Sequence, residues 1–209
     1  INMITHHPNY LYSIDLDSLN NEKIFKEILE AEKCIIEVFG GPFYKENATY
    51  DVYGNFATSQ FEKYNTFQFP LSETSKLYRE LVKNISPFLD KEQDYALQCW
   101  FNVFKKGQNI DWHDHWDPES NVWHGFYCVH VKDSFTEYKL PDIEEIIKVP
   151  SKEGRIVFGK SDGDFHRSSP WDDLNSPRVT IAFDIIPYKN LKLDGSFEEF
   201  IERSFIPFK

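Results

Sequence analysis

The second half of the chain consists of short β-prone runs separated by proline, glycine or aspartate. After residue 95 these runs are "YALQCWFNVFKK", "WHGFYCVHV", "EYKL", "IEEIIKVP", "GRIVFG" and "RVTIAFDIIP". Short strands at close intervals, with turn signals between them, are typical of antiparallel sandwiches and barrels. The sequence therefore predicts a mainly β core over residues 95–188. The run "IEEIIKV" is the ambiguous one, because it is also compatible with a helical turn.

The first half of the chain carries two patterns with helical spacing. Residues 17–33, with Ser18 as a candidate N-cap, and residues 72–89 each place apolar side chains on one face. Between them, "CIIEVFGGP" (34–42) predicts a short strand that ends at its glycines and proline. Residues 43–70 look irregular and would form either a structural loop or a lid. The expected picture is two helices packed outside a β-sandwich.

We expect a single domain over residues 1–209, because the chain has no internal repeat and no segment that looks like a linker. Its parts would be a helical and irregular section (1–94), the β core (95–188) and a C-terminal extension (189–209). The pattern makes no prediction about oligomeric state.

Charge and cysteine content argue against several classes of protein. The net charge of −11 opposes nucleic-acid binding and attraction to an anionic membrane surface, since both need clustered Lys and Arg. The apolar runs are far too short to span a bilayer, and the first residues lack the features of a signal peptide. Three scattered cysteines favour a reducing, cytoplasmic setting. His6 and His7 lie in a Pro- and Asn-rich beginning that we expect to be a solvated tail.

Four of the seven histidines fall within residues 107–131, beside three tryptophans. His113 and His115 are two residues apart, so on an extended strand both would face the same way, about 6–7 Å apart. Asp117 has the same parity if the strand continues. Imidazole and carboxylate ligands with open positions suit non-haem Fe(II). The spacing predicts a metal site, and a half-buried aromatic sheet surface is the alternative.

A third histidine ligand would come from a distant part of the chain. His166 lies in "GKSDGDFHRSSP", just after the run "GRIVFG", and a late strand can return it across the sandwich. His124 and His130 share strand parity with Phe126 and Cys128. We therefore interpret them as packing groups or as neighbours of the ligands.

Arg178 opens the otherwise apolar run "RVTIAFDII", twelve residues after His166 (178 − 166 = 12). A guanidinium at the mouth of a barrel can bind a carboxylate through two hydrogen bonds. Thr180 lies on the same strand face and can donate its hydroxyl to the same anion. An edge-strand arginine in water is the simpler alternative.

Taken together, these residues resemble the Fe(II)/2-oxoglutarate-dependent dioxygenases. The resemblance rests on a glycine-closed strand, then His-x-Asp or His-x-His, a distal His and a later Arg, and it covers roughly residues 96–187. The stretch "QCWFNVFKKGQNIDWHDH" with "WHGFYCV" is most similar to uncharacterised, often phage-encoded, members of the prolyl-hydroxylase-like branch. These members have His-x-His instead of His-x-Asp. The resemblance implies a double-stranded β-helix, or jelly roll, with flanking helices.

The resemblance leaves two ligand sets open. The glycine of this branch precedes the first ligand by the gap that separates Gly107 from His113 (113 − 107 = 6), which puts His115 at the usual carboxylate position. The first set is therefore His113, His115 and His166. The second set is His115, Asp117 and His166, which keeps the usual two-His-one-carboxylate chemistry. We prefer the first set because of the glycine gap.

The resemblance implies a hydroxylase that uses Fe(II), 2-oxoglutarate and O2. The distal carboxylate of 2-oxoglutarate would pair with Arg178, aided by Thr180. Asn102 is a candidate helper, since it shares a strand face with Trp100 and Phe104. The substrate would be an amino-acid side chain, a peptide or a small molecule. The alternatives are a 2-oxoglutarate-independent three-histidine iron dioxygenase and a non-catalytic metal-binding jelly roll.

Overall fold

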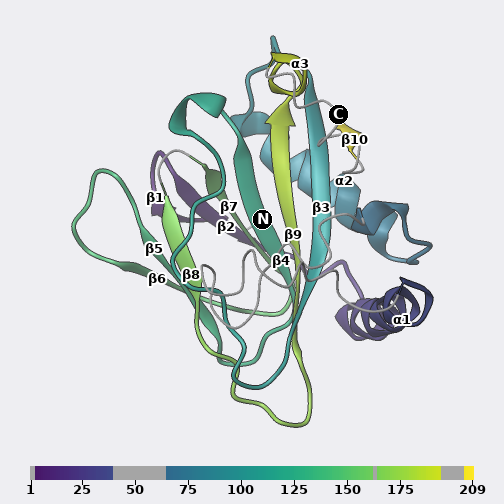
Figure 1. The fold of residues 1–209 in the computed structure, drawn as a ribbon. Helices are drawn as coiled ribbons and strands as arrows, with labels where there is room; N and C mark the ends of the chain where they lie inside the picture. The colour runs from purple at the N-terminus through teal and green to yellow at the C-terminus, as the bar shows by residue number, and fades with distance from the viewer. Residues whose placement is uncertain (1–2, 40–64, 162–163, 194–204) are drawn as a thin grey trace.

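Two antiparallel sheets form the body of the molecule (Figure 1). The computed structural model describes residues 3–39, 65–161, 164–193 and 205–209. The large sheet has the order β1 (Met3–His7), β2 (Leu11–Asp15), β7 (Arg155–Lys160), β4 (Trp123–His130), β9 (Arg178–Pro187), β3 (Tyr95–Phe104) and β10 (Ile206–Phe208). The small sheet has the order β6 (Ile147–Pro150), β5 (Phe135–Lys139) and β8 (Phe165–Ser168).

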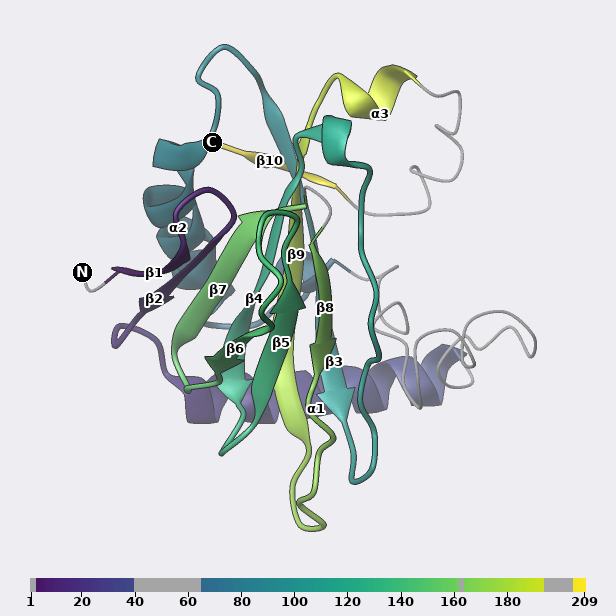
Figure 2. The same ribbon diagram turned by 90° about the vertical axis from the view of Figure 1, so that its left-hand side faces the viewer.

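Helices α1 and α2 and the small sheet lie on opposite sides of the large sheet, as Figures 1 and 2 show. The two long helices are α1 (Asn21–Phe39) and α2 (Thr74–Ile85), and the short ones are α3 (Asn190–Leu193), η2 (Thr66–Gln68), η3 (Ser86–Phe88) and η4 (Pro118–Ser120). In the described ranges, no helix combines the length and the apolar character needed to cross a bilayer. The predicted mainly β jelly roll with flanking helices is confirmed.

The two longest strands, β3 and β9, are buried along their whole length. Successive side chains of a strand point to opposite faces, so each strand serves two environments. One set packs with α1 and α2 in the main core and includes Phe101, Ile181 and Phe183. The other set, which includes Asn102 and Arg178, faces the space between the two sheets. The same alternation therefore builds the core and lines the pocket.

The strand predicted for residues 34–42 is wrong, because α1 continues to Phe39. Ile24, Ile28, Ala31 and Ile35 are all buried in the main core, and their spacing of three and four residues is helical. The apolar run at residues 34–39 thus extends a helical face. The helix also begins later than predicted, since the side chain of Asn20 accepts the Lys23 backbone N–H at 3.0 Å.

The large sheet also extends beyond residues 95–188. The first residues, predicted to be a solvated tail, form β1 and pair with β2, and β2 pairs with β7. β10, from the C-terminal part, pairs with the opposite edge at β3. The helical and irregular N-terminal part therefore contributes two strands to the β core. Most of the predicted irregular span 43–70 lies outside the described residues.

An ion pair between Asp15 and Arg155 joins β2 to β7. Arg155 donates from Nε to Asp15 Oδ1 at 2.7 Å and from Nη2 to Oδ2 at 3.1 Å, and Lys152 donates to Oδ2 at 2.8 Å. The hydrogen bond from Arg155, with further help from Lys152, lowers the pKa of Asp15 to about 2. Because this pKa lies below the ordinary value of 3.8, the pair stabilises the fold above that value and loses its effect as the pH falls toward 2.

We expect Asp15→Asn to lower the free energy of unfolding at pH 7 by about 1–2 kcal/mol, since the shift corresponds to that order after screening by solvent. The difference from wild type should shrink between pH 5 and about pH 2. Urea unfolding followed by circular dichroism measures both. Asp94→Asn is the control, because Asp94 pairs with Lys209 while both side chains are 71% exposed. Equal, pH-independent effects of the two changes would contradict this role of Asp15.

Candidate metal centre

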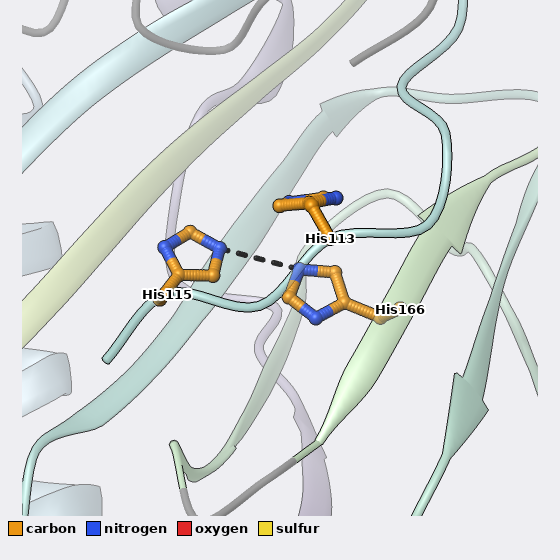
Figure 3. A group of neighbouring side chains, drawn as sticks. All are labelled: His113, His115 and His166. Atoms are coloured by element: carbon orange, nitrogen blue, oxygen red, sulfur yellow. Dashed lines mark hydrogen bonds between the residues drawn. The ribbon is translucent and has the colours of Figure 1, made fainter. Parts of the chain in front are cut away.

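Three histidines from two separate segments of the sequence meet between the two sheets (Figure 3). The backbones of His113 and His166 form an isolated antiparallel bridge, with N–H to O distances of 3.1 and 3.0 Å. The bridge fixes His113 against β8, and His115 follows in the same segment. This segment is not the continuous strand that was predicted, but it still directs His113 and His115 to the same place. The ring centroids of His113 and His166 are 4.3 Å apart.

The imidazole nitrogens are arranged as metal ligands usually are. Nε2 of His115 lies 3.3 Å from Nε2 of His166, and the three histidines offer nitrogens within 4.8 Å of one another. An oxygen faces each Nδ1 atom: the Asp111 carbonyl at 2.8 Å from His113, Asp184 Oδ1 at 3.8 Å from His115, and Asp164 Oδ2 at 3.7 Å from His166. The hydrogen bond to the Asp111 carbonyl favours a proton on Nδ1 of His113 and leaves its Nε2 lone pair for a metal. Asp184 and Asp164 lie beyond hydrogen-bond distance and face Nδ1 of His115 and His166 as charges.

Burial keeps these histidines in the form that binds metals. Burial lowers the pKa of His113, and it holds the pKa values of His115 and His166 well below the ordinary value. The imidazoles are therefore neutral at physiological pH. A metal ion needs the unprotonated nitrogen, so no proton has to be displaced when it binds.

A fourth histidine, His124 of β4, borders the same cluster. Its Nε2 atom lies 2.7 Å from Asp164 Oδ2. Burial acts to lower the pKa of His124, but the carboxylates of Asp164 and Asp184 outweigh burial and raise it. Two further groups could hold a metal ion, namely His115–His124–Asp184 and His124–Asp164–His166. We propose His113–His115–His166 as the ligand set, because the Nε2 atom of His124 is already engaged by Asp164.

Asp117, the carboxylate of the second predicted ligand set, is exposed and precedes η4. It belongs to none of the three His and Asp groups found in the described residues. His130 also lies apart from the cluster, with Glu153 Oε1 at 3.1 Å and Ser176 Oγ at 3.0 Å from its two nitrogens. The structure thus brings together His113, His115 and His166, and it does not bring Asp117 to them.

Arg178 lines the same pocket as the three histidines. Its guanidinium is buried at the start of β9, where Nε donates to Ser134 Oγ at 3.1 Å and the group lies 5.3 Å from the centre of the Phe104 ring. In the part of the chain that the structure describes, Arg178 forms no ion pair with a carboxylate. Burial lowers its pKa, yet a guanidinium remains charged in proteins. A buried cation of this kind favours an anionic ligand.

Other polar groups lie between Arg178 and the histidines. Asn102 pairs with Thr180 across β3 and β9, and its Nδ2 atom donates to Thr180 Oγ1 at 3.3 Å. The Oδ1 atom of Asn102 is buried and makes no hydrogen bond within the described residues. Tyr138, from β5, lines the opposite wall, with its ring 5.4 Å from that of His166. The predicted positions of Arg178, Thr180 and Asn102 thus share one pocket.

The sequence analysis did not identify three residues of this site: Asp164, Asp184 and Tyr138. Asp184 had a usable signal, since it is the one acidic residue in an apolar strand and shares the parity of Arg178 and Thr180. Asp164 also had a signal, because it stands two residues before His166. Tyr138 had none, since nothing in the sequence separates it from an ordinary core aromatic.

Comparisons with known proteins agree with this architecture. No protein-family model matches the sequence, and no curated protein matches it by sequence. Among solved structures, a prolyl hydroxylase from Trichoplax adhaerens, in complex with a hypoxia-inducible-factor peptide fragment, is similar with a TM-score of 0.63. Its identity to the chain is 12%, over 90% of this chain and 88% of that one. AviO1 from Streptomyces viridochromogenes Tue57 matches with a TM-score of 0.53 and 17% identity, over 86% and 90%.

A third structure is SnoN, a non-haem α-ketoglutarate-dependent epimerase from nogalamycin biosynthesis. It matches with a TM-score of 0.50 and 11% identity, over 85% of this chain and 76% of that one. The chain therefore has the jelly-roll fold of the 2-oxoglutarate/Fe(II) oxygenases, as the sequence resemblance implied. At these identities the likeness establishes the fold.

Two alanine variants distinguish the first possible ligand group from the other two. His113 belongs only to the first group, and His124 belongs only to the other two. We expect His113→Ala to abolish tight binding of Co(II) under anaerobic conditions, because it removes a ligand, and His124→Ala to retain it. Titration followed by visible absorption measures the affinity, and circular dichroism checks folding. His124→Gln repeats the test with a donor kept for Asp164. Loss of binding in the His124 variants alone would place the ion in one of the other groups.

Proposed function

We propose that this protein is a non-haem Fe(II)- and 2-oxoglutarate-dependent oxygenase. The observation that carries the proposal is the pairing, in one pocket, of three neutral histidines with the buried guanidinium of Arg178. A metal-ion site alone would not require the arginine, and an anion site alone would not require the histidines. An anion that also coordinates a metal uses both, and 2-oxoglutarate is such an anion.

The donor set fits Fe(II). His113, His115 and His166 would occupy one face of the ion, and imidazole is a suitable ligand for iron. With three protein ligands, the ion would keep positions open for the cosubstrate and O2. When bound, the iron and 2-oxoglutarate supply the oxidising chemistry, in which O2 cleavage is coupled to loss of CO2 from 2-oxoglutarate. The chain holds the ligands in place and excludes water from the pocket.

The pocket also fits the cosubstrate. Arg178 would bind the carboxylate that is remote from the iron, through charge-assisted hydrogen bonds. Thr180 lies two positions beyond Arg178 on β9 and pairs with Asn102 of β3, and both face the same cavity. They would therefore contact the middle of the bound 2-oxoglutarate. Tyr138 contributes a hydroxyl from the opposite sheet. An anionic cosubstrate that also binds the metal would use this row of polar groups, which supports 2-oxoglutarate over the two alternative functions.

The proposed substrate is either an amino-acid side chain of a peptide or a small molecule. The Trichoplax prolyl hydroxylase is bound to a peptide fragment, which supports an amino-acid side chain of a peptide as one substrate. A free amino acid or other small molecule is equally compatible with the pocket. All three cysteines, Cys34, Cys99 and Cys128, are free thiols. This supports a reducing, cytoplasmic location.

We expect Arg178→Ala to weaken 2-oxoglutarate binding while it spares metal binding. Removing one partner of a buried charge pair costs roughly 2–5 kcal/mol, which is about 30-fold or more in affinity. Anaerobic titration of the Fe(II) protein with 2-oxoglutarate measures it, through the visible charge-transfer band of the chelate. Arg167→Ala is the matched control, because Arg167 pairs with Glu137 at 2.6 Å and does not line the pocket.

Turnover decides between the proposal and its alternatives. O2-dependent conversion of 2-oxoglutarate to succinate by the wild type is the expected result. A wild-type protein that binds iron and consumes O2 without 2-oxoglutarate would indicate a cofactor-independent dioxygenase. Equal 2-oxoglutarate affinity in Arg178→Ala and wild type would contradict the assignment of the arginine.

A further inference from the structure

We propose that Asp184 supplies, from behind His115, the negative charge that a carboxylate ligand supplies in a two-His-one-carboxylate iron centre. Asp184 is then a positioning residue that acts on the metal through His115. The inference rests on the proposed function, because it concerns the same metal centre. It assigns a role to a residue that neither the ligand set nor the cosubstrate site includes.

The contacts of Asp184 place it directly behind a ligand. Oδ1 lies 3.8 Å from Nδ1 of His115, on the side of the ring away from His166. Oδ2 accepts the indole N–H of Trp116 at 3.0 Å. The side chain is 5% exposed, so the carboxylate acts in a low-dielectric surrounding where charge has a strong effect. One carboxylate oxygen thus faces the ligand and the other is held by the next residue in the segment.

A three-histidine centre has an electrostatic deficit that such a carboxylate would offset. Three neutral imidazoles leave the full double charge of the ion in a buried site, whereas a carboxylate ligand would cancel part of it. Burying uncompensated charge is costly. A carboxylate that faces Nδ1 beyond hydrogen-bond distance still favours a proton on that nitrogen through its charge, which leaves Nε2 to donate to the metal. Asp184 can do this for His115, the residue at the expected carboxylate position.

Asp164 is less suited to this role, although it lies 3.7 Å from Nδ1 of His166. Its Oδ2 atom is the one that His124 Nε2 approaches at 2.7 Å, so its charge is shared with a second imidazole. The His115 side of the centre is where the sequence has replaced a carboxylate by a histidine, if the glycine gap is correct. The compensating charge therefore lies on the same side as the missing ligand.

The test compares Asp184→Asn with Trp116→Phe in the full-length protein. Asp184→Asn removes the charge and keeps an acceptor for the Trp116 indole. Trp116→Phe removes the indole N–H and keeps the charge. Two quantities are measured anaerobically: the affinity for Fe(II) alone, and the energy of the charge-transfer band of the Fe(II) protein with 2-oxoglutarate. Circular dichroism checks folding, and Asp184→Ser is a second charge-free variant in case the asparagine protein does not fold.

We expect Asp184→Asn to bind Fe(II) ten- to hundredfold more weakly, the usual effect of losing a group that orients a ligand. Its band should move to shorter wavelength, because a less electron-rich iron gives up an electron less readily. Trp116→Phe should keep the wild-type band position. An unchanged affinity and band in Asp184→Asn would overturn the inference. Equal shifts in both variants would also overturn it, since Asp184 would then only hold the segment in place.

The wild-type protein tests the proposed function separately from the role of Asp184. A wild type that binds Fe(II) but develops no band with 2-oxoglutarate would contradict the cosubstrate assignment, and the Fe(II) affinities would still decide the role of Asp184. Loss of binding in Asp184→Asn and His124→Ala, with binding retained in His113→Ala, would overturn the inference in another way. Asp184 would then be a direct ligand in the His115–His124–Asp184 group.

Discussion

The two-residue repeat of strand β9 is the constraint on which the rest of the structure depends. β9 lies between β4 and β3 in the large sheet and is buried on both faces. Its odd-numbered residues, such as Val179 and Ile181, join the core against the helices. Its even-numbered residues Arg178 and Thr180 face the pocket. A shift of one residue in pairing would put the arginine into the apolar core, so register and site are specified together.

Burying the polar face of β9 lowers the stability of the fold unless its polar groups are hydrogen-bonded. Buried polar groups are normally satisfied by hydrogen bonds within the protein. Around this pocket several are not: Asn102 Oδ1, the Trp100 indole nitrogen and Asp164 Oδ1 have no hydrogen-bond partner within the described residues. Selection for stability alone would replace such groups with apolar ones. The proposed metal ion and anionic ligand would complete these interactions around the three histidines.

Local sequence patterns predicted the β core well, because its central strands have strong β propensity and clear turns. The helical continuation at Ile35 was missed because a short apolar run of β-branched residues fits both periods, and contacts with the distant sheet decide between them. Edge strands β1, β8 and β10 are short, so their pairing depends on the rest of the sheet. Within the site, parity predicted that Thr180 faces the same way as Arg178, whereas the pairing of Thr180 with Asn102 depends on the register of β3 and β9. The bridge between His113 and His166 joins residues far apart in sequence, and only the complete fold establishes it.

The proposed metal centre lies between the two sheets, and residues of both sheets surround it. His166 belongs to the small sheet, whereas Arg178 belongs to the large one, and the segment with His113 and His115 is attached to β8 by its backbone. A metal ion held by His115 and His166, and an anion held by that metal and Arg178, would join the two sheets through the pocket. These ligands would also satisfy pocket polar atoms that have no hydrogen-bond partner within the described residues, such as Asn102 Oδ1. Because ligands that bind only the folded state stabilise it, the same residues that carry the chemistry would also close the jelly roll.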